Sequence, residues 1–259
     1  MNLQEINDKI EAQPGFFSMK EMWIWDWILQ YQNEENILGN LVEIGVLKGK
    51  SLSKLAQHHK KHERVLGIDF SMSQDGNKAQ ILNAIKKVSV MPLNLVELVE
   101  CDTLYYNFDA PTNGMYFKEN VRFMHIDGGH DGYTVYNDLK IADKMLSKDG
   151  ILCIDDWRTF FYPDIQDAFY RYITEHPYSF KIVMITDTKM YACRPSNHQD
   201  YLWKFETKLW PFVKNNYKQQ ELVCLRTKHF IDSGKLLLFP KDILTACFDN
   251  SGNCFDEIK

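Results

Sequence analysis

The sequence lacks a long hydrophobic run, an excess of positive charge, closely paired cysteines and the glycine pattern of a dinucleotide site. Its most apolar stretch, residues 22–29, is interrupted by Asp26 and is too short to span a bilayer. The net charge of −5 argues against a nucleic-acid or anionic-membrane partner, because both need a basic face. The first residues show no basic segment followed by an apolar one, so we expect no signal peptide and a cytoplasmic location.

The six cysteines are scattered and include no CxxC pair. Several lie among strand-forming residues, so reduced thiols in the core are expected rather than disulfides or a zinc site. The histidines at 58, 59 and 62 have basic neighbours and are expected to lie on a solvated helix end without a metal. The cysteines are Cys101, Cys153, Cys193, Cys224, Cys247 and Cys254.

The length of 259 residues fits one α/β domain with additions. Runs of β-favouring residues alternate with helical patterns, which is typical of βαβ units around a parallel sheet. Residues 181–185 and 189–194, joined by a TDT turn, are expected to form an antiparallel pair at the sheet edge. We expect strands near 41–45, 64–69, 95–101, 121–127 and 151–155, and helices near 49–60, 77–88, 132–146 and 164–175.

The segment before the first strand is expected to contain a helix over residues 16–32. It begins with a capping box in which Ser18 is the N-cap and Glu21 lies three positions on. Its tryptophans at 23, 25 and 27 are not all expected to face inward on one helix. A homodimer or lid contact through this helix is therefore the alternative to packing within the chain.

The tail is expected to extend the same domain rather than form one of its own. A helix should bend or end near Pro211, and residues 221–231 and 235–239 suggest a second hairpin. This divides the chain into an N-terminal helical segment, a cofactor-binding domain and a C-terminal extension, at residues 1–39, 40–195 and 196–259.

The string LVEIGVLKGKS, residues 41–51, places Gly45 directly after a strand and Gly49 at the start of a helix. Glycines let backbone N–H groups approach a ligand closely, and a helix N-terminus presents unpaired donors. The spacing differs from the GxGxxG of dinucleotide sites. Glu43 would repel pyrophosphate but could hold an ammonium group, and Asp69 ends the next strand, where acids bind ribose hydroxyls. The pattern favours a cationic cofactor that carries an amino acid.

Asp127, Asp155 and Asp156 follow two strands that we expect to be neighbours. Three converging carboxylates would repel one another unless a cation or protons neutralised them. Oxygen ligands suit Mg²⁺ or Ca²⁺, and Mg²⁺ keeps positions open for water and substrate. In the other interpretation, Asp127 and Asp156 only cap the helices that follow. We expect a Mg²⁺ site, with helix capping as the alternative.

Five strings resemble motifs of the class I S-adenosylmethionine-dependent methyltransferases: EIGVLKGKS, GID at 67–69, IDGGH at 126–130, NDL at 137–139 and IDDW at 154–157. The resemblance covers about residues 40–195. It is closest to the small-molecule O-methyltransferase branch that includes macrocin-type and other sugar O-methyltransferases. It implies a Rossmann-like, doubly wound α/β sheet of seven mostly parallel strands with an antiparallel last strand. It also implies that acids at the strand ends hold a divalent metal.

The same resemblance implies roles around S-adenosylmethionine. Asp102 alone is ambiguous, because an acid that ends a strand is as often a turn former. The implied site has Glu43, Gly45, Gly49 and Ser51 around the methionine part, Asp69 on the ribose, and Asp102 with Thr103 near the adenine.

Methyl transfer to an alcohol needs help, because an alcohol has a pKa of about 15 that a divalent ion can lower. His130 is the preferred base, since histidine changes charge near physiological pH, and Asp127 is the second catalytic candidate. Related sequences usually carry an aromatic residue two places after this histidine, and some metal-dependent ones carry an acid one place before it. Here those positions are Gly132 and Gly129, so Asp131 and Tyr133 are reserve candidates for the base.

These observations predict an O-methyltransferase that acts on a hydroxyl of a small molecule, such as a sugar or a diol, with S-adenosylmethionine and Mg²⁺. One alternative is a metal-independent methyltransferase in which His130 alone is the base. Another is a regulatory protein that binds the cofactor without turnover. A dinucleotide oxidoreductase is least supported. The aromatic residues after the fifth strand are expected to form a platform for the acceptor: Trp157, Phe160, Phe161 and Tyr162.

Overall fold

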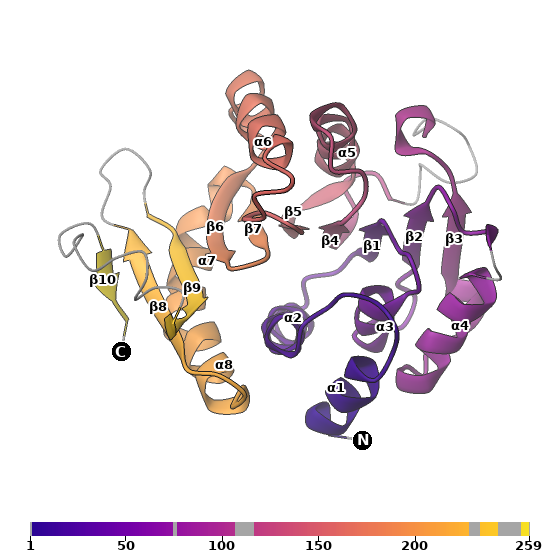
Figure 1. The fold of residues 1–259 in the computed structure, drawn as a ribbon, viewed down its shortest axis with the longest axis horizontal. Helices are drawn as coiled ribbons and strands as arrows, with labels where there is room; N and C mark the ends of the chain where they lie inside the picture. Colours follow the sequence, from indigo (N-terminus) through magenta and orange to yellow (C-terminus); the bar gives the residue numbers. More distant parts are fainter. Residues whose placement is uncertain (1, 75–76, 107–116, 228–233, 243–254, 259) are drawn as a thin grey trace.

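Helices cover both faces of one continuous sheet in the computed structural model (Figure 1). The structure describes residues 2–74, 77–106, 117–227, 234–242 and 255–258. Within these ranges the strands of the sheet are β1 (Asn40–Ile44), β2 (Val65–Asp69), β3 (Val96–Glu100), β4 (Val121–Ile126), β5 (Leu146–Ile154), β6 (Lys181–Thr186), β7 (Met190–Cys193), β8 (Leu222–Thr227), β9 (Leu236–Pro240) and β10 (Phe255–Glu257).

Seven of these strands, in the order β3-β2-β1-β4-β5-β7-β6, form the sheet that the resemblance implied. Strand β1 pairs in parallel with β2 and β4, and the outer pairs β2–β3 and β4–β5 are parallel as well. Strand β7 is antiparallel to both β5 and β6, as expected for the last strand. The strand order reverses between β1 and β4, which is where open α/β sheets bind ligands.

The sheet does not stop at seven strands, which corrects the expected count. Strand β9 pairs in parallel with β6, β8 is antiparallel to β9, and β10 is antiparallel to β8. The β8–β9 pair is the expected second hairpin, although residues 228–231 of its first arm lie outside the described residues. Without β9, the outer edge of β6 would expose unpaired backbone groups. The apolar strand β9 pairs with that edge. The tail thus continues the central sheet.

The helices fall into two groups that bury separate clusters of apolar side chains. Alternation along each strand points Leu41 and Phe123 into one cluster and Val42 and Met124 into the other. Helices α5 (Gly132–Met145) and α6 (Asp164–Glu175) cover one face. The other face is covered by α1 (Leu3–Glu11), α2 (Met19–Glu34), α3 (Lys50–Gln57), α4 (Asn77–Val88), α7 (His198–Lys204) and α8 (Trp210–Asn216).

In the part of the chain that the structure describes, no helix combines the length and the apolar character needed to cross a membrane. A π-helical turn, Phe205–Leu209, links α7 to α8, so the helix expected to bend or end near Pro211 does not end there and continues to Asn216. Proline is tolerated there because it occupies the first turn of α8. The described cysteines at 101, 153, 193 and 224 are free, as expected. Cys247 and Cys254 lie outside the described residues.

The N-terminal segment contains α1 as well as the expected helix. Ser18 accepts a hydrogen bond from the Glu21 backbone at the start of α2, but the Glu21 carboxylate accepts from Thr186 Oγ1 at 2.7 Å instead of closing a capping box. Glu21 therefore faces the sheet.

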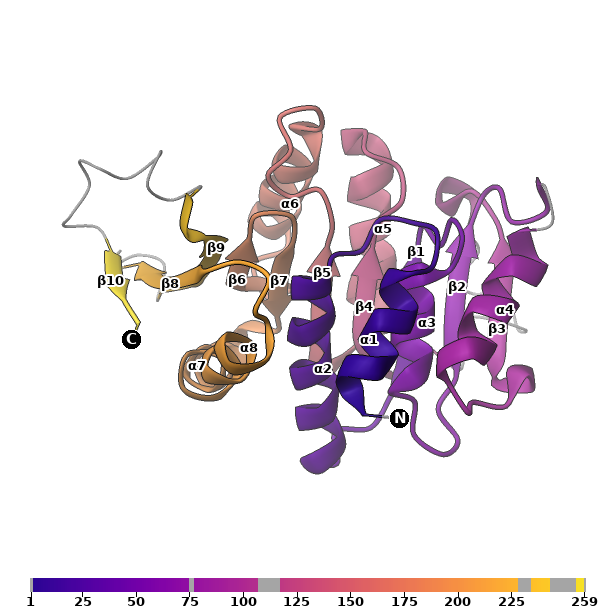
Figure 2. The same cartoon turned by 60° about the horizontal axis from the view of Figure 1, so that its bottom comes forward.

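The three tryptophans of α2 are not buried equally, in keeping with the expectation that they cannot all face inward: Trp27 is only partly buried. Trp23 and Trp25 are buried, and Trp27 packs edge-on against Phe205. This is possible because α2 lies between the sheet and the C-terminal helices, against α8 (Figure 2). A homodimer contact through this helix stays a prediction.

The environment of His58 also differs from the expected solvated helix end. His58 is buried and its Nε2 lies 2.7 Å from Asp26 Oδ1, which also pairs with Lys54. The cluster joins α2 to α3 and has a structural role.

Candidate active site

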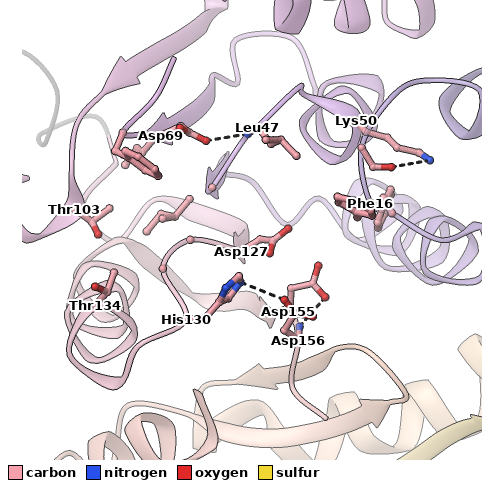
Figure 3. A pocket seen from close by; sticks show the side chains of 18 of the residues that line it. Phe16, Leu47, Lys50, Asp69, Thr103, Asp127, His130, Thr134, Asp155 and Asp156 are labelled. Carbon is pink, nitrogen blue, oxygen red and sulfur yellow. Dashed lines mark hydrogen bonds and ion pairs between the residues drawn. The ribbon is translucent and has the colours of Figure 1, made fainter. Parts of the chain in front are cut away.

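The carboxyl ends of β1, β2, β4 and β5 surround one cavity of about 1040 Å³. Ligand pockets usually measure about 300–1,000 Å³, so this volume has room for two small ligands. Asp69 and Thr103 lie toward one end, and Asp127, Asp155 and His130 gather at another (Figure 3). The structure thus brings together most of the side chains expected at the site. Those that line the cavity are Gly45, Asp69, Asp102, Thr103, Asp127, His130, Asp155 and Asp156.

Two expected glycines and a serine have roles in packing. Gly45 lines the cavity with a φ of +84°, and a Cβ there would lie 1.8 Å from the Asp127 backbone oxygen. It therefore allows the ends of β1 and β4 to approach closely. Gly49 has a φ of +80° and packs on Ile81 of α4. Neither Gly49 nor the buried Ser51 lines the cavity.

Asp69 holds the loop after β1. Its Oδ2 accepts hydrogen bonds from the backbone N–H groups of Val46 and Leu47, both at 2.9 Å. Its Oδ1 accepts from the backbone and the hydroxyl of Ser71, both at 2.8 Å. The carboxylate therefore already binds four donors while it lines the cavity. Sequence reasoning found its place at the strand end but missed its contact with this loop.

The loop after the neighbouring strand β3 carries Asp102 and Thr103. Asp102 Oδ1 accepts from the Leu104 backbone at 3.0 Å, so the side chain caps a short helical turn. The Thr103 carbonyl accepts from Asn137 Nδ2 at 2.7 Å. Asn137 lies on α5, so this helix fixes the position of the loop that carries both residues.

Glu43 lies beneath the cavity and does not line it. It is fully buried, and its Oε1 is 2.7 Å from Nδ1 of His125 on β4. The resemblance placed Glu43 beside the methionine part of the cofactor, whereas here it supports a buried histidine. Sequence reasoning missed His125; the only signal is a polar residue inside the apolar run of β4.

Lys189 is the second residue that sequence reasoning missed. It is buried and lines the floor of the cavity, with its Nζ 3.0 Å from His125 Nε2 and ion-paired with Asp155 Oδ2. In the sequence, Lys189 directly follows the TDT turn, a position at which a lysine is usually exposed to solvent. The β6–β7 hairpin instead folds it under the acidic cluster.

The cluster is electrostatically asymmetric. Burial and the nearby Asp155 raise the pKa of Asp127 well above its usual value. Burial also opposes ionisation of Asp155, but Lys189 and then His125 outweigh it and lower the pKa of this carboxyl. Burial and Asp155 raise the pKa of Asp156. The repulsion expected from the sequence is therefore relieved by an internal lysine and by protons.

His130 stands at the mouth of this cluster. Its ring stacks on Tyr162, with centroids 4.0 Å apart and planes at 20°. Its Nε2 lies 3.2 Å from Asp156 Oδ2 and makes no hydrogen bond. Asp156 has a φ of +52°, which turns it away from the direction of the strand. The stacking holds the imidazole at the cavity, within reach of Asp127 and Asp156.

Neither reserve base faces the cavity. Asp131 caps α5, where it accepts from the backbone N–H groups at 133 and 134, and the Tyr133 side chain is exposed. The expected aromatic platform is only partly present, because Trp157 is buried against Phe169, and Tyr162 is its one member that lines the cavity.

Residues outside the strand ends complete the walls. The connection between α1 and α2 contributes Phe16, and Lys50 Nζ donates to the backbone oxygens of Glu11 and Gly15 that flank it, at 3.2 and 3.4 Å. Glu21 and Thr188 line the floor beside Lys189. The sequence motifs that include Glu21 and Lys50 do not indicate that these residues lie at or beside the cavity.

Comparisons with protein families and solved structures indicate a methyltransferase-type α/β fold. A family model described as a methyltransferase domain matches residues 42–157. No curated protein sequence matches the chain.

Solved structures share the fold at low identity. The apo structure of CalS11, titled a TDP-rhamnose 3'-O-methyltransferase of calicheamicin biosynthesis, has a TM-score of 0.55 and 15% identity over 74% of this chain and 92% of that one. An O-methyltransferase from Bacillus cereus in complex with SAH has a TM-score of 0.51 and 18% identity over 74% and 89%. TomG from Streptomyces achromogenes, in complex with SAM, has a TM-score of 0.51 and 12% identity over 74% and 88%. Residues 42–157 therefore match the methyltransferase-domain family model, and the chain shares the fold of these solved methyltransferases.

Proposed function

We propose that the enzyme transfers the methyl group of S-adenosylmethionine to a hydroxyl of a small molecule. The observation that supports this proposal is one shared cavity, lined by Asp69 and Asp102 at one end and by Asp127 and Asp156 at the other. A donor and an acceptor bound side by side in one cavity have already lost the freedom of motion that a meeting in solution would cost. Structural neighbours titled as O-methyltransferases, one bound to SAM and one to SAH, support the same chemistry.

At the donor end, we propose that Asp69 binds the ribose hydroxyls and that Asp102 and Thr103 lie beside the adenine. Each oxygen of Asp69 already has two donors, so binding the ribose requires Ser71 to yield its hydrogen bonds. Gly45 and the loop that Asp69 holds would face the methionine part. Glu43, Gly49 and Ser51 support this wall from behind, since they do not line the cavity.

At the acceptor end, we propose that a divalent ion, Mg²⁺, binds among the carboxylates. The residues fit such an ion: Asp127, His130 and Asp156 each offer one ligand atom, and these atoms lie within 4.8 Å of one another. Asp155 belongs to the expected set too, but it is already paired with Lys189. Bound there, the ion would lower the pKa of the acceptor hydroxyl and orient it.

A metal-independent reaction is the second candidate, and the position of His130 Nε2, 3.2 Å from Asp156 Oδ2, favours it. This nitrogen makes no hydrogen bond and borders the cavity, so it is available to take the acceptor proton. Removal of divalent ions distinguishes the two candidates. Turnover that survives EDTA would support the histidine base and exclude the metal-assisted reaction.

For the acceptor itself, we propose an uncharged hydroxyl compound, such as a sugar or a diol. The walls at this end combine the aromatic rings of Phe16 and Tyr162 with the polar groups of Ser18 and Thr188, a mixture that suits a ring with several hydroxyls. A cytoplasmic setting without a nucleic-acid partner is part of the proposal, in keeping with the free cysteines and the acidic net charge. A homodimer through the N-terminal helix would be checked by sedimentation.

The test combines ligand binding with product detection. S-adenosylhomocysteine should raise the melting temperature more than NAD does, because a ligand that binds only the folded chain stabilises it. A larger shift with NAD would overturn the donor assignment. Incubation of the chain with labelled S-adenosylmethionine and a panel of sugars, diols and phenols should then yield a methylated product. Cofactor binding without a methylated product from any compound of the panel would favour a regulatory protein.

A further inference from the structure

Lys189 is enclosed on every side by groups that interact with its charge. Its Nζ lies 3.0 Å from His125 Nε2 and pairs with Asp155 Oδ2. The rings of Phe17 and Trp25 have their centroids 5.6 and 6.0 Å from the same nitrogen. An ammonium group at the floor of an acidic cavity is thus held in one place.

This position decides the protonation of His125. Lysine has only donors, so His125 Nε2 must accept the hydrogen bond from Lys189. The proton of the neutral ring is then on Nδ1, which donates to Glu43 Oε1 at 2.7 Å. Both ring nitrogens are engaged. A continuous hydrogen-bonded chain runs from Glu43 through His125 and Lys189 to Asp155.

Among the described residues, two groups of side chains could hold a cation, and they share Asp127. The inner group adds His125 and Asp155, and the outer group adds His130 and Asp156. In the inner group, both histidine nitrogens are taken and the carboxylate is paired with an ammonium that would repel a metal ion. In the outer group, His130 Nε2 makes no hydrogen bond and borders the cavity. Only the outer group can accept a new cation.

We propose that Lys189 is a resident cation that fills the inner group and restricts divalent-metal binding to Asp127, His130 and Asp156. Asp155 is then a positioning residue that anchors Lys189, although it directly precedes a metal ligand in the sequence. The arrangement gives the enzyme one metal site instead of two. This inference rests on the proposed metal-assisted function.

Binding of Mn²⁺ to the full chain tests the inference without any activity measurement. We would titrate the wild type, Asp155→Asn and Asp156→Asn with Mn²⁺ and count bound ions by electron paramagnetic resonance. The wild type should bind one ion. Asp156→Asn should weaken binding at least tenfold, while Asp155→Asn should change it by less than about threefold, because only Asp156 contacts the ion. Equal losses in the two variants, or two ions in the wild type, would overturn the inference.

A variant of Lys189 tests the inference independently of the two asparagine variants. Lys189→Met keeps the length of the side chain and removes its charge, which frees Asp155 and His125 to bind a second Mn²⁺. Lys20→Met is the matched control, because Lys20 is a buried lysine paired with Asp187 that does not line the cavity. If Lys189→Met fails to fold, the comparison of the two asparagine variants still decides the question.

Two further outcomes separate this inference from the proposed function. If the wild type binds no Mn²⁺ and Lys189→Met binds one, Lys189 is the resident cation and metal assistance of the reaction is excluded. If neither binds Mn²⁺, the inference is overturned, whereas methyl transfer itself is still judged by the labelled product.

Discussion

Glu43 and His125 lie opposite each other on the paired strands β1 and β4, and their side chains are joined by a 2.7 Å hydrogen bond. Both residues are fully buried. Glu43, which the sequence resemblance assigned to the cofactor site, therefore contacts His125 and does not line the cavity. Through His125 and Lys189, this pair is connected to the acidic cluster at the other end of the cavity.

The first prediction concerns the stability of this pair. Glu43→Ala should lower the free energy of unfolding by about 3 kcal/mol, because it leaves a buried imidazole N–H unpaired and opens a void. Glu43→Gln should cost only about 1 kcal/mol, since the amide oxygen can still accept from Nδ1. Urea denaturation measures both values. Equal losses would show that the hydrogen bond to His125 contributes nothing.

The second prediction concerns the pH dependence of stability. Burial raises the pKa of Asp138 on α5 to about 7. Between about pH 4 and pH 7, the folded chain therefore holds a proton that the unfolded chain has released, so stability falls as pH rises, by up to about 1.4 kcal/mol per pH unit. Above pH 7 this group adds no further slope.

Asp138→Asn should remove that contribution and make the protein more stable than the wild type at pH 8. Denaturation curves at pH 5 and pH 8 for both proteins give the difference directly, and other titrating groups cancel. A wild-type to variant difference that stays constant across this range would contradict the prediction.

The third prediction concerns the metal-independent candidate, in which His130 is the base. His130→Gln should lower kcat by about 10² to 10⁴-fold, the usual contribution of a positioned general base, and leave the affinity for S-adenosylhomocysteine unchanged. Tyr133→Phe is the matched control, because that side chain is exposed and does not line the cavity. A loss in Tyr133→Phe as large as the loss in His130→Gln would move the base to the tyrosine.

The fourth prediction concerns the donor end. Asp69→Asn should weaken binding of S-adenosylhomocysteine by about 10- to 100-fold, because a charged acceptor is lost for both the ribose and the loop at Val46 and Leu47. Ser71→Ala leaves that loop held and should bind at least as tightly as the wild type. Calorimetric titration compares them. Unchanged affinity in Asp69→Asn would remove this residue from the cofactor site.

Sequence reasoning predicted the parts of the fold that depend on local pattern. Strand and helix alternation is encoded in neighbouring residues, and acids at strand ends, such as Asp69, Asp127 and Asp155, meet because parallel strands end at the same edge. The antiparallel β7 followed from its short turn to β6. These features require no knowledge of distant contacts.

The residues that sequence reasoning missed are defined by distant contacts. His125 and Lys189 are separated by 64 positions, and nothing in the sequence around either residue indicates that the two side chains meet. The burial of Trp25 depends on Phe123 and Tyr191, and the addition of β9 to the sheet depends on the free edge of β6. Only the assembled fold brings such partners together.

The enclosure of α2 has a consequence for turnover. Trp25 donates to the Tyr191 hydroxyl at 3.1 Å, and Glu21 accepts from the same hydroxyl, so the helix is fastened to the middle of the sheet. Movement of α2 away from the sheet would expose the hydrophobic core that the helix covers. A change in access to the cavity would therefore involve other segments that line it, such as those that carry Phe16 and Tyr162.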